Sequence, residues 1–166
     1  MCIMQIVRTN SFILDSITYG GREEHYCTGE QITPELIADI KRDIIEGKVF
    51  FVLAQTEDET EDQFQLEINK GLHGEKWLEI YIEHTDAEKI EHIFMYCDEK
   101  YIKHKRDFEG QKEFDQNIIL KSSCCYDFNT AAEIFGKWTL TGMLNPGLWW
   151  HQWDDGEDHF ELTEVY

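Results

Sequence analysis

The chain has 166 residues, of which 42% are hydrophobic and 13% aromatic, a composition typical of a folded domain and not of a disordered segment. Asp and Glu number 34 against 15 Lys and Arg, so the formal net charge is −19. Such a charge repels nucleic acid and anionic membranes and attracts basic protein surfaces, which argues against a nucleic-acid or membrane partner.

The first elements that the sequence predicts are two short strands and a helix. Ile3–Val7 and Phe12–Leu14 are apolar and are separated by polar residues, which favours a hairpin. Residues 33–46 form an amphipathic pattern that is typical of a helix. Thr33 is a suitable N-cap, and Pro34 fits the first helical position.

A run of strands follows this helix. Val49–Ala54 is continuously apolar, which is typical of a central strand covered on both faces. Gln63–Ile68 and Trp77–Glu83 alternate between apolar and polar residues, as half-buried strands do. Ile90–Cys97 and Asn117–Leu120 are predicted to be the next two strands.

Residues 130–153 combine a second helix with a tryptophan-rich segment. Thr130 and Glu133 have the spacing of a capping box, and the apolar residues that follow recur at helical intervals. Gly142 is suited to the left-handed residue that ends a helix, and Pro146 prevents its continuation. Three tryptophans lie just beyond: Trp149, Trp150 and Trp153.

These elements predict an α+β fold, with two main helices packed on an antiparallel sheet of about five to seven strands. Residues 1–166 are expected to form a single domain, since no Gly/Ser-rich linker divides them. The acidic, Trp-rich tail of residues 149–166 is expected to pack on the sheet or extend it, and Phe160–Tyr166 alternates like an edge strand.

The cysteines and the first residues point to a cytoplasmic protein. Five cysteines are odd in number and irregularly spaced, which fits reduced thiols. The segment MCIMQIVRTN lacks the features of a secretory signal, and no apolar run approaches the roughly 20 residues that span a bilayer.

A search for catalytic motifs yields little. Phosphate-binding glycine loops and the G-x-S-x-G motif are absent from the sequence. Cys124 and Cys125 precede the second helix, but buried, unreactive cysteines are the better interpretation. His151, Asp155 and His159 are spaced at four-residue intervals, which would suit a metal on a helix, although the surrounding residues do not predict one. We therefore expect no cofactor and no catalytic residue.

A binding surface is the remaining hypothesis, because acidic and aromatic residues occur together in three segments. Aromatic anchors within a charged rim are typical of protein interfaces. The candidate partner-binding residues are Trp77, Glu79, Tyr81 and Glu83 on one predicted strand; Glu57, Asp58, Glu59, Glu61 and Asp62 in an acidic loop; and Trp150, Trp153, Asp154 and Asp155 in the tail.

The C-terminal residues resemble a known family. A helix with an alanine pair and an aromatic residue is followed by Thr-Gly, a proline and a tryptophan; these residues are Ala131, Ala132, Phe135, Thr141, Gly142, Pro146 and Trp149. The pattern is similar to the end of the first immunity-protein family of bacterial polymorphic toxin systems. The resemblance covers about twenty residues, and it implies an α+β protein that neutralises a cognate toxin domain, often a nuclease or a deaminase.

The expected function is therefore a non-enzymatic, acidic inhibitor that covers the basic active site of a toxin, with Trp77, Tyr81 or Trp150 as anchors. Two alternatives stay open. One is an adaptor without a toxin partner, which the sequence does not separate from an inhibitor. The other is a metal-dependent hydrolase that uses His151, Asp155 and His159.

Overall fold

The structure is a computed structural model that describes residues 2–3, 12–19, 32–56, 62–70, 74–86, 88–99, 111–114, 117–120, 123–154 and 157–163. These residues form an eight-stranded sheet, a separate two-stranded sheet and two helices, α1 (Pro34–Ile45) and α3 (Phe128–Thr141). The predicted α+β fold is confirmed. The large sheet runs, in spatial order, β1 (Cys2–Ile3), β10 (Glu157–Thr163), β9 (Trp149–Asp154), β6 (Glu91–Cys97), β5 (Lys76–Thr85), β4 (Asp62–Lys70), β3 (Val49–Thr56) and β2 (Phe12–Tyr19).

Neighbouring strands of the large sheet are antiparallel, apart from the short parallel pair β1–β10. The sheet is one strand larger than the predicted upper bound, because β9 and β10 form a hairpin that continues it beyond β6. The Trp-rich tail therefore extends the sheet. The two-stranded sheet pairs β7 (Gln111–Phe114) with β8 (Asn117–Leu120).

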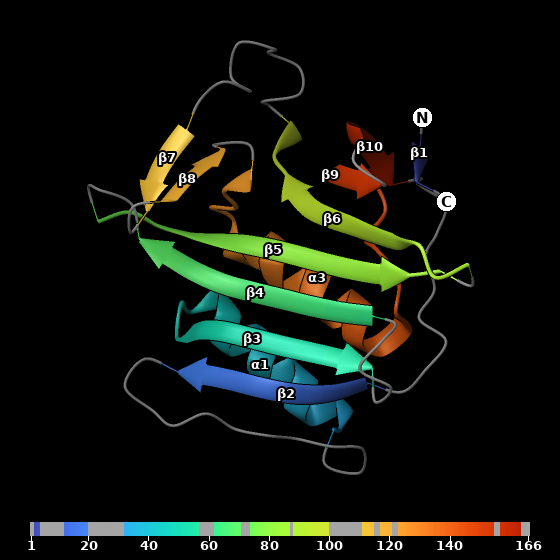
Figure 1. Cartoon of the computed structure of the whole chain (residues 1–166). Coiled ribbons are helices and arrows are strands. Elements are labelled where there is room, and N and C mark those ends of the chain that lie inside the picture. The colour runs from blue at the N-terminus through green and yellow to red at the C-terminus, as the bar shows by residue number, and fades with distance from the viewer. Residues whose placement is uncertain are drawn as a thin grey trace.

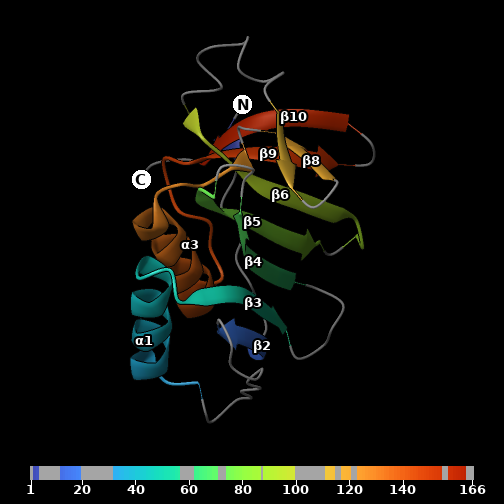
Figure 2. The same cartoon turned by 90° about the vertical axis from the view of Figure 1, so that its left-hand side faces the viewer.

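Both helices lie on the same side of the large sheet, as Figures 1 and 2 show. The sequence predicts the start of α1 correctly: Thr33 is the N-cap, and its Oγ1 accepts a hydrogen bond of 3.2 Å from the Leu36 amide. The helices are joined at their surface by an ion pair of 3.0 Å between Lys41 and Glu133. One sheet face is thus covered by α1 and α3, and neither of these two described helices lies over the other face.

The predicted capping box of the second helix is wrong. The N-cap of α3 is Asp127, and the helix begins at Phe128, before Thr130. The Asp127 carboxylate accepts hydrogen bonds of 3.0 Å from the Asn129 amide and from the Thr130 hydroxyl, so the acid outcompetes the threonine as the cap. Gly142 ends the helix with φ of 70°, as predicted.

The core lies between the helices and the sheet. Phe64 of β4 is fully buried, and its ring centroid is 5.6 Å from those of Phe135 and Trp138 on α3. The segment before α3 is fixed to the sheet as well, because Leu78 and Cys125 exchange backbone hydrogen bonds of 2.8 and 2.9 Å. The burial of Phe64, Leu66 and Ile68 follows the alternation that the sequence predicts.

Two further predictions are wrong, one about strand pairing and one about the burial of β3. Ile3 belongs to β1, which pairs with β10, whereas β2 pairs with β3, so the N-terminal hairpin is wrong. β3 is not covered on both faces: its buried residues alternate with half-buried ones, and Phe50 is exposed. The reason is that β3 lies one strand from the β2 edge, with helices on only one side.

Candidate functional site

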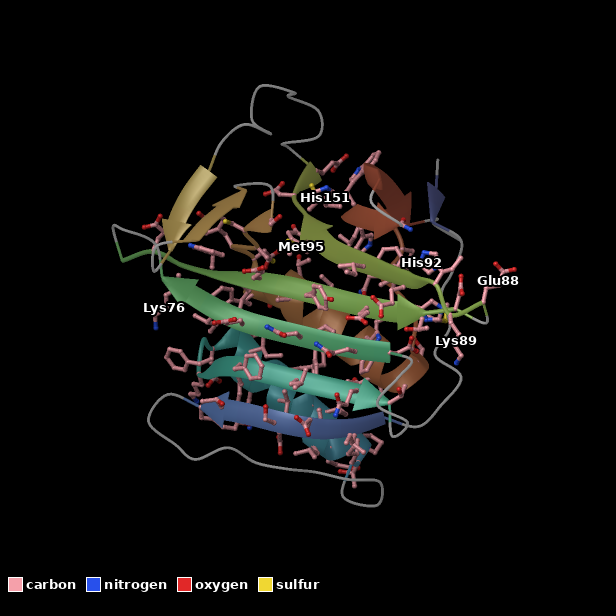
Figure 3. The ribbon with its side chains drawn as sticks, in the orientation of Figure 1. Lys76, Glu88, Lys89, His92, Met95 and His151 are labelled. Carbon is pink, nitrogen blue, oxygen red and sulfur yellow. The ribbon has the colours of Figure 1, made fainter. Side chains whose placement is uncertain are left out.

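The sheet face that lies away from the helices carries polar side chains at its centre, and we call it the open face (Figure 3). On β5 it presents Glu79, Tyr81 and Glu83, which are half-buried. On β4 the partners directly opposite these three residues are Glu67, Gln65 and Gln63. The alternation that buries the core residues therefore brings six polar side chains together on one surface.

Tyr81 is held in place by its neighbour along the strand. Its hydroxyl donates a hydrogen bond of 2.7 Å to Glu83 Oε2. Burial raises the pKa of Tyr81 well above its ordinary value, and the bond to the Glu83 carboxylate raises it further. The phenol is therefore a hydrogen-bond donor fixed on the open face, and not a proton acceptor at neutral pH.

Next to Tyr81 the open face is hollowed. The hollow has a volume of about 360 Å³ and is lined by residues of three adjacent strands: Gln63, Gln65 and Glu67 of β4, Glu79 and Tyr81 of β5, and Met95 of β6. Tyr81 lies between Gln65 and Met95 in the register, so these three side chains form its central row. Of the wall residues that the structure describes, Glu67 and Glu79 are acidic and none is basic. The described walls therefore favour a cationic ligand over an anionic one.

Apolar residues flank this acidic centre. The register places Phe51 and Leu53 of β3 on the same face, opposite Glu67 and Gln65, and both are half-buried. Ile93 of β6 lies opposite Glu83 and is also half-buried. The face thus joins negative charge to apolar area, as a protein interface does.

Two of the predicted aromatic anchors are wrong. Trp77 and Trp150 are fully buried, so neither indole is accessible to a partner. Trp150 packs edge-on against Tyr96, with ring centroids 6.5 Å apart. Large aromatic side chains contribute most to stability when they are buried, and here they are buried within the fold itself.

The predicted acidic loop is only partly placed. Asp62 is the first residue of β4 and is 8% exposed, which rules it out as an open partner-binding acid. Its carboxylate lies 2.6 Å from His84 Nδ1, and its amide donates to Thr56 Oγ1 at 3.3 Å. The buried acid thus joins three strands. Glu57, Asp58, Glu59 and Glu61 lie outside the described residues, and their role stays a prediction.

The tail residues divide in the same way. Trp153 and Asp154 belong to β9, where they pair with Ile93 and His92, and their side chains lie outside the description. Asp155 is itself outside the described residues. Of the predicted binding residues with described side chains, Glu79, Tyr81 and Glu83 therefore share one accessible surface.

The helical spacing behind the metal hypothesis is wrong, because His151 and His159 lie on the two strands of a hairpin. His151 is paired with Phe160, whereas His159 is paired with Gln152, the next register position, and adjacent positions belong to opposite faces. Within the described ranges, no group of three or more His, Cys, Asp or Glu side chains is arranged to hold a metal ion.

Sequence reasoning missed two histidine–aspartate pairs at one end of β5. His84 is paired with Asp62, and His92 Nε2 lies 2.9 Å from Asp86 Oδ2. The two imidazole rings are stacked with centroids 6.3 Å apart. The bond to His92, helped by the Ile90 and Glu88 amides, lowers the pKa of Asp86. The strand register would reveal these pairs, but single-strand alternation does not.

The hollow was also missed as a unit, although its outward-facing residues on β4 and β5 were identified one strand at a time.

A comparison of the chain with family models, with curated proteins and with solved structures finds no match. Of the helices that the structure describes, none has the length and apolarity that crossing a membrane requires.

Proposed function

We propose that this protein is a non-enzymatic inhibitor that binds a basic protein through the open face of its sheet. The favoured partner is a cognate toxin domain, such as a nuclease or a deaminase, in the cytoplasm of the producing cell. The inhibitor blocks the toxin by covering the cationic active site that would otherwise hold nucleic-acid phosphates.

One observation carries this proposal: Glu67, Glu79 and Glu83 lie together beside a hollow on the sheet face opposite the described helices α1 and α3. The formal net charge of −19 is also negative, so the electrostatic attraction of the whole molecule would speed its association with a basic partner, which then binds at the open face. The C-terminal resemblance to immunity proteins points in the same direction.

The structure changes which residues the proposal uses. The contact surface centres on Glu79, Tyr81 and Glu83, with Glu67, Gln63 and Gln65 opposite them. Trp77, Trp150 and Asp62 are left out because they are buried. The adaptor alternative would use the same surface, and the two functions differ in whether the partner is toxic.

Co-expression with the product of the gene immediately upstream tests the proposal. We expect a stable 1:1 complex and survival of cells that the upstream product alone would kill. The variant Glu79→Gln/Glu83→Gln should lose affinity for the partner by about tenfold or more, because charge-assisted contacts are removed.

The matched control is Glu88→Gln/Glu133→Gln, which removes the same charge from exposed positions on the β5–β6 turn and on α3. This control should bind almost as well as the native protein, with only a slower association rate. An unchanged affinity in the Glu79→Gln/Glu83→Gln variant would exclude the open face as the inhibitory surface.

A further inference from the structure

We propose that a second pocket, at the corner between the end of α1 and the start of β3, binds a small ligand that carries both an aromatic ring and a phosphate group. This corner pocket has a volume of about 670 Å³, within the range of small-molecule sites, about 300–1,000 Å³. It shares no lining residue with the hollow on the open face. The proposal is therefore independent of the inhibitor function.

Three separate segments bring positive charge to the corner pocket. Arg42 belongs to the last turn of α1, Lys48 to the turn that follows, and Lys76 is the first residue of β5. The turn fixes the backbone of Lys48 close to the helix end: Gly47 has φ of 68°, and the Lys48 amide donates a hydrogen bond of 2.9 Å to the Asp43 carbonyl. Cations that converge from different elements favour an anionic group between them.

The acids at this corner do not cancel that preference. Of the lining residues that the structure describes, three are basic and one, Asp43, is acidic. Arg42 is paired with Asp39 at 3.0 Å and with Asp43 at 3.6 Å. Lys48 is paired with Glu46. The Arg42 and Lys48 side chains are 59% and 61% exposed, and exposed ion pairs contribute little to stability, so a phosphate can replace these carboxylates at low cost.

An aromatic wall lies beside the cations. Phe50 and Tyr19 both line the pocket, and Phe50 is one of the few large apolar residues that the fold leaves exposed, at 36%. Lys76 Nζ lies over the Phe50 ring, 5.5 Å from its centroid. A ligand ring that packs on Phe50 would remove apolar area from water and bring an attached phosphate within reach of the Lys76 ammonium. A ligand with both groups is therefore favoured over a simple anion.

The acidity of the whole molecule weakens binding of a phosphate but does not prevent it. The formal net charge of −19 repels anions at long range, whereas the screening length at physiological ionic strength is only about 8 Å. Within the pocket the phosphate would instead form charge-assisted hydrogen bonds with Arg42, Lys48 and Lys76. We expect a dissociation constant in the millimolar range, on the order of 1 mM.

An NMR titration of the purified full chain with phenyl phosphate tests this site. The probe should shift the ring signals of Phe50 and Tyr19 in a saturable manner. Inorganic phosphate and benzyl alcohol each carry one of the two groups, and each should bind about fivefold more weakly or less tightly still. The variant Phe50→Leu should lower the affinity for phenyl phosphate and leave that for inorganic phosphate unchanged, because only the ring contact is altered.

The charge of the pocket is tested separately. Lys48→Gln/Lys76→Gln should weaken binding of phenyl phosphate by about tenfold or more. The matched control is Lys89→Gln/Lys137→Gln, which removes the same charge from the β5–β6 turn and from α3 and should bind the probe as the native chain does. Lys76 and Lys89 lie at opposite ends of the sheet in Figure 3. The melting temperature of each variant shows that it is folded.

Four results would overturn the proposal. Saturable shifts could be absent, or they could map outside the corner pocket. Inorganic phosphate could bind as tightly as phenyl phosphate, which would show that the aromatic wall has no part in binding. The control variant could lose as much affinity as Lys48→Gln/Lys76→Gln, which would show a general response to charge and not a site.

Discussion

Cys125 shows how burial sets the chemistry of a single residue. The side chain is 1% exposed, and its Sγ donates a hydrogen bond of 3.3 Å to the Asp127 carbonyl. Burial, above all, raises the pKa of the thiol to about 12. Because only the thiolate is nucleophilic, the position of this cysteine before a helix does not activate it.

We therefore predict that Cys125 resists thiol reagents in the native protein. At pH 8 the thiolate fraction is about one in 10⁴, so modification should be slow until urea unfolds the chain. Mass spectrometry of peptides after native and urea-treated labelling measures this. Rapid native labelling of Cys125 would contradict the prediction.

Glu67 provides a second test at a single position. Its charge faces that of Glu79 across the β4–β5 pair, so Glu67→Gln should stabilise the free protein. We expect the melting temperature to rise by up to about 3 °C, because relief of such repulsion contributes less than about 1 kcal/mol. Calorimetry measures the change, and Glu133→Gln, which breaks a surface ion pair, should give no increase.

At this scale the sequence predicts which way a side chain points but not what covers it. The alternation of Trp77–Glu83 correctly separates Leu78, Ile80 and Ile82 from Glu79 and Tyr81. Trp77 has the same alternation as Glu79, yet it is fully buried. The alternation assigns a side chain to one face of the sheet, but it does not show what covers that face.

Among the elements, α3 depends on an acid that precedes it. Asp127→Ala should lower the melting temperature by about 2–4 °C, because loss of an N-cap costs about 1 kcal/mol. Thr130→Ala should lower it less, since Thr130 only donates to the cap. Thermal unfolding of both variants decides the matter, and a larger loss for Thr130→Ala would place the helix start at the threonine.

The charge of Asp127 gives this helix a dependence on pH. Burial alone would raise the pKa of Asp127, but hydrogen bonds from Thr130 and Asn129 outweigh it and lower the pKa. A depressed pKa stabilises the fold above the ordinary value of about 3.9, and the contribution is lost as the pH falls through the folded pKa. The melting temperatures of native protein and Asp127→Asn should therefore differ at pH 7 and converge near pH 2.

The elements also show which contacts a sequence encodes locally. The start of α1 was predictable, because a cap and a proline act within one turn of helix. The N-terminal hairpin was not, since two short apolar segments carry no information on whether they pair with each other or with distant strands. The hollow likewise depends on the register of three strands and could not be read from any one of them.

For the whole molecule, the excess of negative charge opposes folding and favours association. A formal net charge of −19 on 166 residues destabilises the compact state by self-repulsion. Part of that repulsion is concentrated on the open face, where Glu67, Glu79 and Glu83 lie on paired strands. A basic partner reduces this repulsion by binding to the acidic surface. Dissolved salt reduces it by screening, but the same screening opposes formation of the complex.

We therefore predict salt slopes of opposite sign. Raising sodium chloride from about 0.01 M to about 0.3 M shortens the screening length from about 30 Å to less than 10 Å, so the melting temperature of the free protein should rise. The same change should slow association with a basic partner. Scanning calorimetry measures the first effect and stopped-flow fluorescence the second. A melting temperature that falls with salt would show that ion pairs such as Lys41–Glu133 outweigh the repulsion, and the acidic surface would then need no partner to offset it.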